Sequence, residues 1–151
     1  MRRWRAASGA LALALTLAAC ARHPAPGAVL PYDPLRETAL VRDAAAGFIG
    51  AEARGDESAD TLLVPGADFI MGGIPVTSRP RLAGVLGPGQ ATVVDLRTQL
   101  AGDFAWVVAV YDWADDGGTD SARGRATMIL ERRSAGWRIR HVHSSTVAPW
   151  R

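Results

Sequence analysis

The sequence predicts an α+β domain in which a strongly curved antiparallel sheet wraps around one long N-terminal helix. Two observations lead to this expectation. Residues 34–54 repeat apolar side chains at helical spacing. Four long stretches of strand-forming residues then follow one another between residues 90 and 147, joined by short turns. Consecutive strands with short turns form an antiparallel meander, and an amphipathic helix must cover one face of it.

The long helix is expected to begin at Asp33-Pro34, because Asp caps helix N-termini and Pro suits the first helical position. It is expected to end near Gly55-Asp56. Its apolar arc includes Val41 and Phe48, and Arg42 projects from within this arc. The Arg42 side chain therefore either extends to solvent or enters a partly polar interior, where it binds an anionic ligand or pairs with an internal carboxylate.

Shorter elements are expected between the helix and the meander. A helical turn is predicted over residues 58–63, and a β-hairpin around Gly72-Gly73. Ser78 is a candidate cap for a short helix through Val85, which Gly87-Pro88-Gly89 ends. The expected order of elements is α-β-β-α-β-β-β-β. Arg79 and Arg81, in the second short helix, are expected to be solvated.

The long strands are predicted over residues 90–101, 104–114, 122–133 and 137–147. Alternate side chains of a strand share one face. In the last strand, Trp137, Ile139, His141 and His143 are therefore expected to point the same way. Since Trp137 and Ile139 are core residue types, that face is expected to be the concave one, with both imidazoles at the opening of a pocket.

The N-terminal segment predicts export and lipidation. Residues 1–19 combine three arginines with an apolar run that is too short to span a bilayer. The run ends in Leu17-Ala18-Ala19-Cys20, which resembles a bacterial lipobox. That resemblance implies cleavage before Cys20, a diacylglycerol on its sulfur, an acylated N-terminus and a place in the cell envelope, facing the periplasm or the exterior. An ordinary signal peptide is the alternative.

The mature chain is expected to consist of a Pro-rich tether, residues 20–32, and one domain, residues 33–151. The full chain has 17 arginines and no lysine, against 15 acidic residues. Removing the three arginines of residues 1–19 leaves 14 against 15, a net charge of −1. Net charge therefore gives no reason to expect nucleic-acid binding. Cys20 is the only cysteine, so no internal disulfide is expected.

Two passages carry a family resemblance. "GDESADTLLVPGADFIMGG" and "GWRIRHVHSS" resemble the helix-to-strand passage and the last strand of the nuclear transport factor 2-like superfamily, which includes SnoaL-like proteins and ketosteroid isomerases. The resemblance covers about residues 33–147. It implies a cone-shaped, cystatin-like domain with a pocket between the first helix and the sheet, and frequent dimerisation through the sheet. It implies no single activity, since members include isomerases, cyclases, dehydratases, assembly domains and binders.

The candidate site residues follow from the predicted pocket. Arg42, Trp106, His141 and His143 are the candidate ligand-binding residues; Trp106 is otherwise a core or interface residue. His143 and Asp112 are the candidate general bases. Asp112 shares the phase of Trp106, so it either lies among apolar neighbours with a raised pKa or is solvated at the end of its strand. Structural roles for both histidines are the alternative.

A metal site would need a third ligand beside His141 and His143, and Asp112 is the best candidate, but we expect no bound metal and no cofactor. No phosphate-binding loop or nucleophile elbow occurs in the sequence. The expected function is binding of a small apolar or amphipathic molecule. An isomerase- or dehydratase-like enzyme and a non-catalytic assembly module, dimeric through its sheet, are the alternatives.

Overall fold

The computed structural model describes residues 32–148. The predicted segment 1–19, Cys20 and His23 lie outside these residues. The described chain forms α1 (Pro34–Arg54), the 3-10 helix η1 (Glu57–Leu62), β1 (Leu63–Met71), β2 (Ile74–Pro75), β3 (Gly89–Ala101), β4 (Phe104–Asp115), β5 (Ser121–Arg133) and β6 (Gly136–Thr146). Within residues 32–148, no helix has the length and apolar character needed to cross a membrane.

The bounds of α1 agree with the sequence prediction. The Asp33 carboxylate accepts hydrogen bonds from the backbone N–H groups of Leu35 (3.0 Å) and Arg36 (3.3 Å) at the N-terminus. Gly55 ends the helix with a φ of 67°, a left-handed conformation that glycine adopts without strain. Local capping signals therefore position both ends of the helix.

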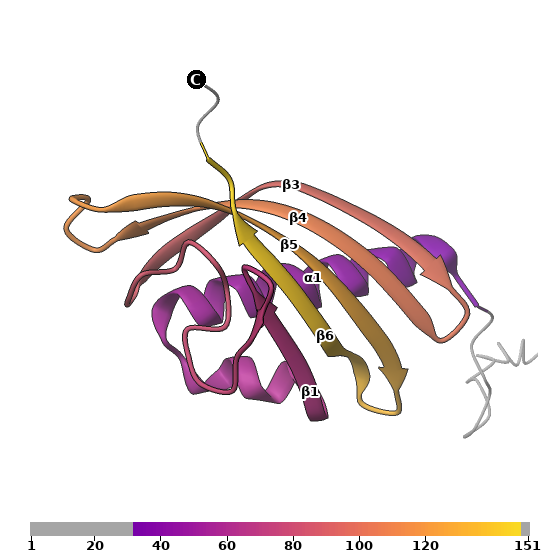
Figure 1. The fold of residues 1–151 in the computed structure, drawn as a ribbon. Coiled ribbons are helices and arrows are strands. Elements are labelled where there is room, and N and C mark those ends of the chain that lie inside the picture. Colours follow the sequence, from indigo (N-terminus) through magenta and orange to yellow (C-terminus); the bar gives the residue numbers. More distant parts are fainter. Residues whose placement is uncertain (1–31, 149–151) are drawn as a thin grey trace, which may run out of the picture. The chain divides into compact units, whose positions relative to one another are not determined.

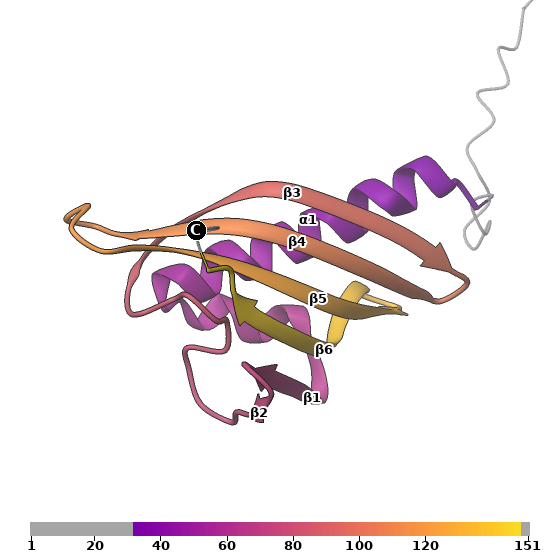
Figure 2. The same ribbon diagram turned by 45° about the horizontal axis from the view of Figure 1, so that its top comes forward.

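The six strands form one curved sheet in the order β2-β1-β6-β5-β4-β3. The four long strands pair antiparallel, as predicted, whereas β1 joins the edge of β6 in parallel. Figure 1 shows β3, β4, β5 and β6 side by side with α1 lying across one face, and Figure 2 shows the short β1-β2 hairpin beyond β6. We call the face covered by α1 the inner face, and the opposite face the outer face.

The core lies between α1 and the inner face. Alternate residues of β4 from Ala105 to Trp113 are buried, and so are Val41, Phe48 and Ile49 of α1. Burying a side chain of this size contributes about 1.5–3 kcal/mol relative to leaving it exposed. The remaining residues of β4 point to the outer face, where α1 does not cover them.

A β-bulge interrupts the alternation in β6. Leu130 pairs with Ile139, and the preceding residue of β5, Ile129, pairs with His141. Arg140 is therefore an extra residue without a partner in the ladder. A bulge of one residue reverses the face to which every later side chain of the strand points. Trp137 and Ile139 face inward, but from His141 onward the odd-numbered residues face outward.

The predicted short helix from Ser78 to Val85 is wrong. These residues form an irregular connection that runs past the C-terminal end of α1 (Figure 1). The backbone groups of Ala83 explain why no helix forms, because both find partners outside the segment. Its N–H donates to Ser144 Oγ (3.0 Å) and its carbonyl accepts from the Tyr111 hydroxyl (2.6 Å).

Candidate functional site

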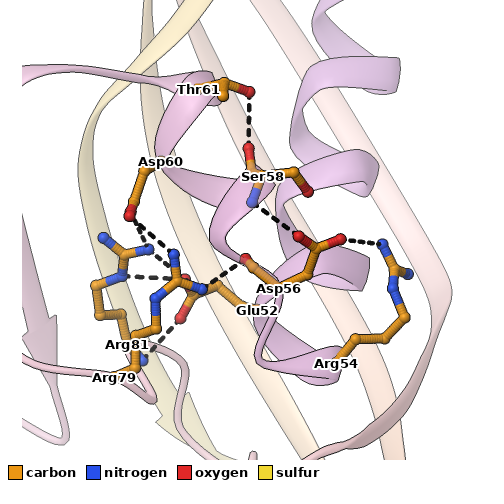
Figure 3. Close-up of polar contacts among 8 residues, drawn as sticks. All are labelled: Glu52, Arg54, Asp56, Ser58, Asp60, Thr61, Arg79 and Arg81. Carbon is orange, nitrogen blue, oxygen red and sulfur yellow. Dashed lines mark hydrogen bonds and ion pairs between the residues drawn. The ribbon is translucent and has the colours of Figure 1, made fainter.

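A charge cluster around the buried Glu52 joins the C-terminal turn of α1 to the connection between β2 and β3 (Figure 3). The Glu52 side chain is completely buried and accepts hydrogen bonds from Arg81 Nε and from the Arg81 backbone N–H, both at 3.0 Å. Arg81 also contacts Asp60 (2.7 Å), and Arg79 contacts Glu52 (3.3 Å) and Asp60 (3.0 Å). Two carboxylates thus balance two guanidinium groups.

The environment of Arg81 keeps its charge in place. Its guanidinium carbon lies 4.8 Å from the ring centroid of Phe69 and 5.8 Å from that of Phe48. Burial disfavours the charged form, but the hydrogen bonds to Glu52 and Asp60 outweigh it and raise the Arg81 pKa. The same contacts, from Arg81 and then Arg79, hold the Asp60 pKa below its usual value. The cluster is charge-balanced, so it offers no free cation to an anionic ligand.

Neighbouring contacts fasten this region further. The Asp56 carboxylate caps η1 through the Ser58 N–H (2.8 Å) and lies 3.7 Å from Arg54. The Asp56 carbonyl accepts from Arg79 Nη1 (2.7 Å). The helix end, η1 and the connection are therefore held together by contacts among their own residues (Figure 3).

The expectation that Arg79 and Arg81 are solvated is wrong. Arg81 is buried, and Arg79 is partly buried. Glu52 was the signal that sequence reasoning missed. It follows Val41, Ala45 and Phe48 at spacings of four, three and four residues, so it belongs to the buried stripe of the helix. A carboxylate in that stripe requires a buried cationic partner.

Glu37 is a second buried carboxylate that the sequence reasoning missed. Its two oxygens accept hydrogen bonds from Trp137 Nε1 (2.8 Å) and Arg132 Nη2 (2.9 Å). It occupies the same helical stripe as Val41, one turn earlier. The indole of Trp137 is thereby fixed against the N-terminal half of α1. This contact lies at the end of the core opposite the Glu52 cluster.

The space between α1 and the sheet is occupied by side chains. The completely buried residues include aromatic and large aliphatic side chains from the helix, the sheet and the connection after β2. The largest of them are Tyr111, Phe48, Ile49, Leu82, Met128, Leu130 and Ile139. Burial raises the pKa of the Tyr111 phenol, whose hydroxyl already donates to Ala83. The Tyr111 hydroxyl is thus already engaged, whereas the buried Trp113 Nε1 has no hydrogen-bond partner among residues 32–148.

Solvent-open grooves lie elsewhere along residues 32–148. One, of about 1280 Å³, lies beside the turn between β4 and β5 and is lined by Asp112, Arg123 and Thr146 among others. Another, of about 580 Å³, follows β1 and includes Phe69 and His141 in its lining. His141 therefore does border a groove, but it borders one at the sheet edge.

The expectation that His141 and His143 face the concave interior is wrong. The bulge at Arg140 turns both imidazoles to the outer face, while Val142 and Ser144 point inward and are buried. His143 is exposed and His141 is partly exposed. Any role of the two imidazoles must therefore be exercised on the outer face.

Asp112 and Trp106 also lie on the outer face. The Asp112 carboxylate binds Arg123 through two hydrogen bonds of 2.6 and 2.8 Å, which hold its pKa below the usual range. The alternative of a raised pKa among apolar neighbours is therefore wrong, and its half-exposed side chain agrees with the solvated alternative. Trp106 is 57 % exposed. A residue of this size, exposed on a strand, is available to a partner.

Arg42 is separated from these residues by the sheet. It lies on α1, is exposed, and donates to the backbone carbonyl of Leu96 (2.8 Å) at the edge of the sheet. The structure thus brings His141 and His143 together on one strand but does not gather Arg42, Trp106 and Asp112 around them. No cluster of three or more His, Cys, Asp or Glu side chains within residues 32–148 could hold a metal ion.

The outer face forms ordered rows of side chains across the strands. One row runs Gln99, Trp106, Ile129, His141 and Asp68 from β3 to β1. The next row runs Arg97, Val108, Thr127, His143 and Ile70. The outer face thus has an apolar centre on β4 and β5 and polar or charged groups on both sides of it.

Comparison with known proteins identifies the domain type. A family model described as "SnoaL-like domain" matches residues 41–149. No curated protein matches the chain. Among solved structures, a proposed dehydratase of the NTF2-like family from Streptomyces avermitilis superposes with a TM-score of 0.62 at 21% identity, over 78% of this chain and 100% of that one.

Two further structures have the same fold. The CaMKII hub of S. rosetta superposes with a TM-score of 0.57 at 22% identity, over 78% of this chain and 100% of that one. An NTF2-like protein with a cystatin-like fold from Novosphingobium aromaticivorans gives 0.60 at 16% identity, over 77% and 85% of the two chains. At such low identities these likenesses establish the fold and leave the activity open.

Proposed function

Because this chain belongs to the SnoaL-like domain family, whose fold serves unrelated functions, we propose from its own surfaces that it is a non-catalytic assembly module. In this proposal the outer face pairs with a second copy of the chain. The observation that carries the proposal is the exposed apolar centre of that face. Trp106 is 57 % exposed, Phe104 47 % and Ile129 36 %, and Val108 follows Trp106 on the same face of β4.

The extent of the outer face suits an interface. Four strands of 11 to 13 residues contribute to it. At about 4.8 Å between strands and about 3.3 Å per residue, they cover roughly 700 Å². Stable interfaces bury about 800 Å² per partner. The face is thus of the size that one copy contributes to a stable dimer.

The charges of the outer face favour a second copy as the occupant. Arg97 and Asp95 pair on β3 (3.1 Å), Arg125 of β5 lies in the same row as Asp95, and Asp68 of β1 lies beside His141. An interface between identical copies related by a two-fold axis places the same surface on both sides, so it must carry both signs of charge. A face of mixed sign around an apolar centre meets this requirement. A nucleic acid or another polyanion would favour a face of one sign.

The other two predicted functions have less support. A bound apolar molecule or an isomerase- or dehydratase-like reaction needs a hollow interior with polar groups directed into it. Here that interior is occupied by Phe48, Tyr111 and Leu82. The hydroxyl groups of Tyr111 and Ser144 are already hydrogen-bonded to the backbone of Ala83. The candidate bases, His143 and Asp112, lie on the outer face.

We further propose that Cys20 is lipidated and anchors the module in a bacterial envelope, so that pairing takes place between membrane-tethered copies. This part rests on the sequence of residues 1–20 alone. Mass spectrometry of the chain purified from membranes tests it. An N-terminus at Cys20 with the mass of a diacylglycerol and an acyl chain is expected, and an intact or unacylated N-terminus contradicts it.

Sedimentation of the full chain in density-matched non-ionic detergent tests the assembly. We expect a monomer–dimer equilibrium that Trp106→Glu shifts strongly to monomer, because the substitution places a charge that must be desolvated in the apolar centre of the interface. Leu35→Glu is the matched control, since Leu35 is an exposed leucine on α1. A wild-type monomer at 100 μM, or equal weakening by both substitutions, contradicts the proposal.

A further inference from the structure

The two histidines of β6 lie inside the proposed interface. On the outer face His141 lies between Asp68 of β1 and Ile129 of β5, and His143 lies between Ile70 and Thr127. The same rows continue to Trp106 and Val108 on β4. A partner that covers the apolar centre therefore approaches both imidazoles as well.

Other charged side chains lie near the two imidazoles on the outer face. Along β6 itself Arg140 precedes them, and it pairs with Glu131 of β5 (2.6 Å). Arg125 of β5 lies one row further, and Arg97 of β3 lies at the far end of the His143 row. Asp68 beside His141 is the nearest carboxylate along the rows. Arg97 in turn pairs with Asp95 of its own strand (3.1 Å), so these arginines are matched by the carboxylates Glu131, Asp95 and Asp68.

The carboxylates of the ion pairs keep their charge over the range in which imidazole titrates. Hydrogen bonds from Arg123 hold the Asp112 pKa below its usual value, and those from Arg140 do the same for Glu131. Imidazole is the side chain whose charge ordinarily changes between pH 5 and 8. His141 and His143 are the imidazole side chains on the outer face of the described sheet.

We propose that protonation of His141 and His143 dissociates the dimer, so that assembly of this module is controlled by pH. The inference rests on the proposed function and adds its regulation. Pairing brings two imidazoles from each copy into a desolvated interface whose arginines Arg97 and Arg140 are already paired with carboxylates. Desolvation disfavours the imidazolium form.

The sign of the pH effect follows from linkage. Burial in the dimer lowers the affinity of the imidazoles for protons, so the separated chains bind more protons than the dimer does. Lowering the pH through the imidazole range therefore favours the separated chains. The stabilising contribution of the neutral imidazoles is complete at high pH and is lost as the pH falls.

The dissociation constant measured by sedimentation at pH 7.5 and pH 5.5 tests the inference. We expect the wild-type constant to rise about ten-fold or more at pH 5.5, and that of His141→Gln/His143→Gln to change less than about two-fold. Both values of pH lie above the range in which carboxylates ordinarily protonate. Single variants show how the effect divides between the two imidazoles.

The outcomes separate this inference from the proposed function. A dimer whose constant is independent of pH, or a double variant that keeps the full pH effect, overturns the inference and leaves the assembly standing. The absence of a dimer at pH 7.5 overturns the assembly itself. Should the double variant fail to pair, NMR titration of the wild-type imidazoles decides: their pKa must be lower in concentrated, dimeric samples than in dilute ones, and equal values overturn the inference.

Discussion

Glu52 and Glu37 lie on the buried stripe of α1, and each is neutralised by arginine from a distant part of the chain. A buried carboxylate is tolerated only when a cation and hydrogen bonds replace its water. Glu52 therefore dictates where the connection after β2 must pass, because Arg81 has to reach it. The Glu52–Arg81 pair therefore fixes the position of this connection as well as stabilising the fold.

We predict that Glu52→Gln lowers the free energy of unfolding by about 3 kcal/mol or more, because the buried Arg81 loses one of its two carboxylate partners and Asp60 alone is left to balance two guanidinium groups. Urea denaturation followed by circular dichroism measures the change. Glu57→Gln, an exposed glutamate in η1, is the control and should change stability by less than about 0.5 kcal/mol. Equal effects of the two substitutions would show that the buried pair contributes nothing.

The Asp60 carboxylate predicts a specific acid dependence. Hydrogen bonds from Arg81 and Arg79 lower its pKa below 3.8 in the folded chain, so its contribution is complete above that pH and is lost as the pH falls. We expect Asp60→Asn to have a lower urea midpoint than wild type at pH 6. The difference between the two midpoints should decrease below pH 3.8. A difference that is constant with pH would contradict this assignment.

The sequence contained the signal for both buried glutamates, since each occurs at the spacing of the apolar stripe. Their partners were not predictable in the same way. Arg81 and Arg132 lie 29 and 95 residues away along the chain from Glu52 and Glu37, and only the packed fold brings them together. Local periodicity shows which side chain is buried, but it does not identify a distant partner.

Among the elements, α1 and the four long strands could be predicted because their signals are local. A capping Asp, a terminal Gly and short polar turns fix their ends, and alternation of side chains fixes the strands. The bulge at Arg140 has no comparable signal, since an extra residue in a strand looks like any other. That one residue reversed the face of His141 and His143 and, with it, the predicted site.

The connection after β2 was mispredicted for a related reason. Its caps and glycines suit a short helix, but Ser144 and Tyr111 bind the backbone of Ala83, which lies in a single turn closed by a hydrogen bond from Val85 N–H to the Leu82 carbonyl (3.2 Å). Gly124 of β5 makes room for the Tyr111 ring. A Cβ atom at this position would lie 2.3 Å from Tyr111 Cζ and 2.5 Å from the Ala83 carbonyl oxygen.

We predict that Gly124→Ala destabilises the domain by about 1–3 kcal/mol, because the added methyl displaces the Tyr111 hydroxyl from Ala83. Thermal unfolding measures this effect. Gly87→Ala is the control, since a Cβ atom there meets no other group within 4 Å. If Gly124→Ala is as stable as Gly87→Ala, Tyr111 does not fix the connection.

For the molecule as a whole, the curved sheet encloses a filled core and leaves its other face uncovered. The sequence predicted this curved α+β architecture. It could not predict whether the space under the helix is hollow, because that depends on how Leu82 and Tyr111 pack after folding. With the interior occupied, the apolar centre on β4 and β5 is the surface that remains available to a partner.

Isotope-filtered NMR on an equimolar mixture of ¹³C-labelled and unlabelled chains tests this pairing most directly. We expect intermolecular NMR contacts from the methyl groups of Val108, Val110 and Ile129, and none from Leu35 or Leu40 of α1. Intermolecular contacts confined to α1, or their complete absence in concentrated samples at pH 7.5, would contradict this pairing.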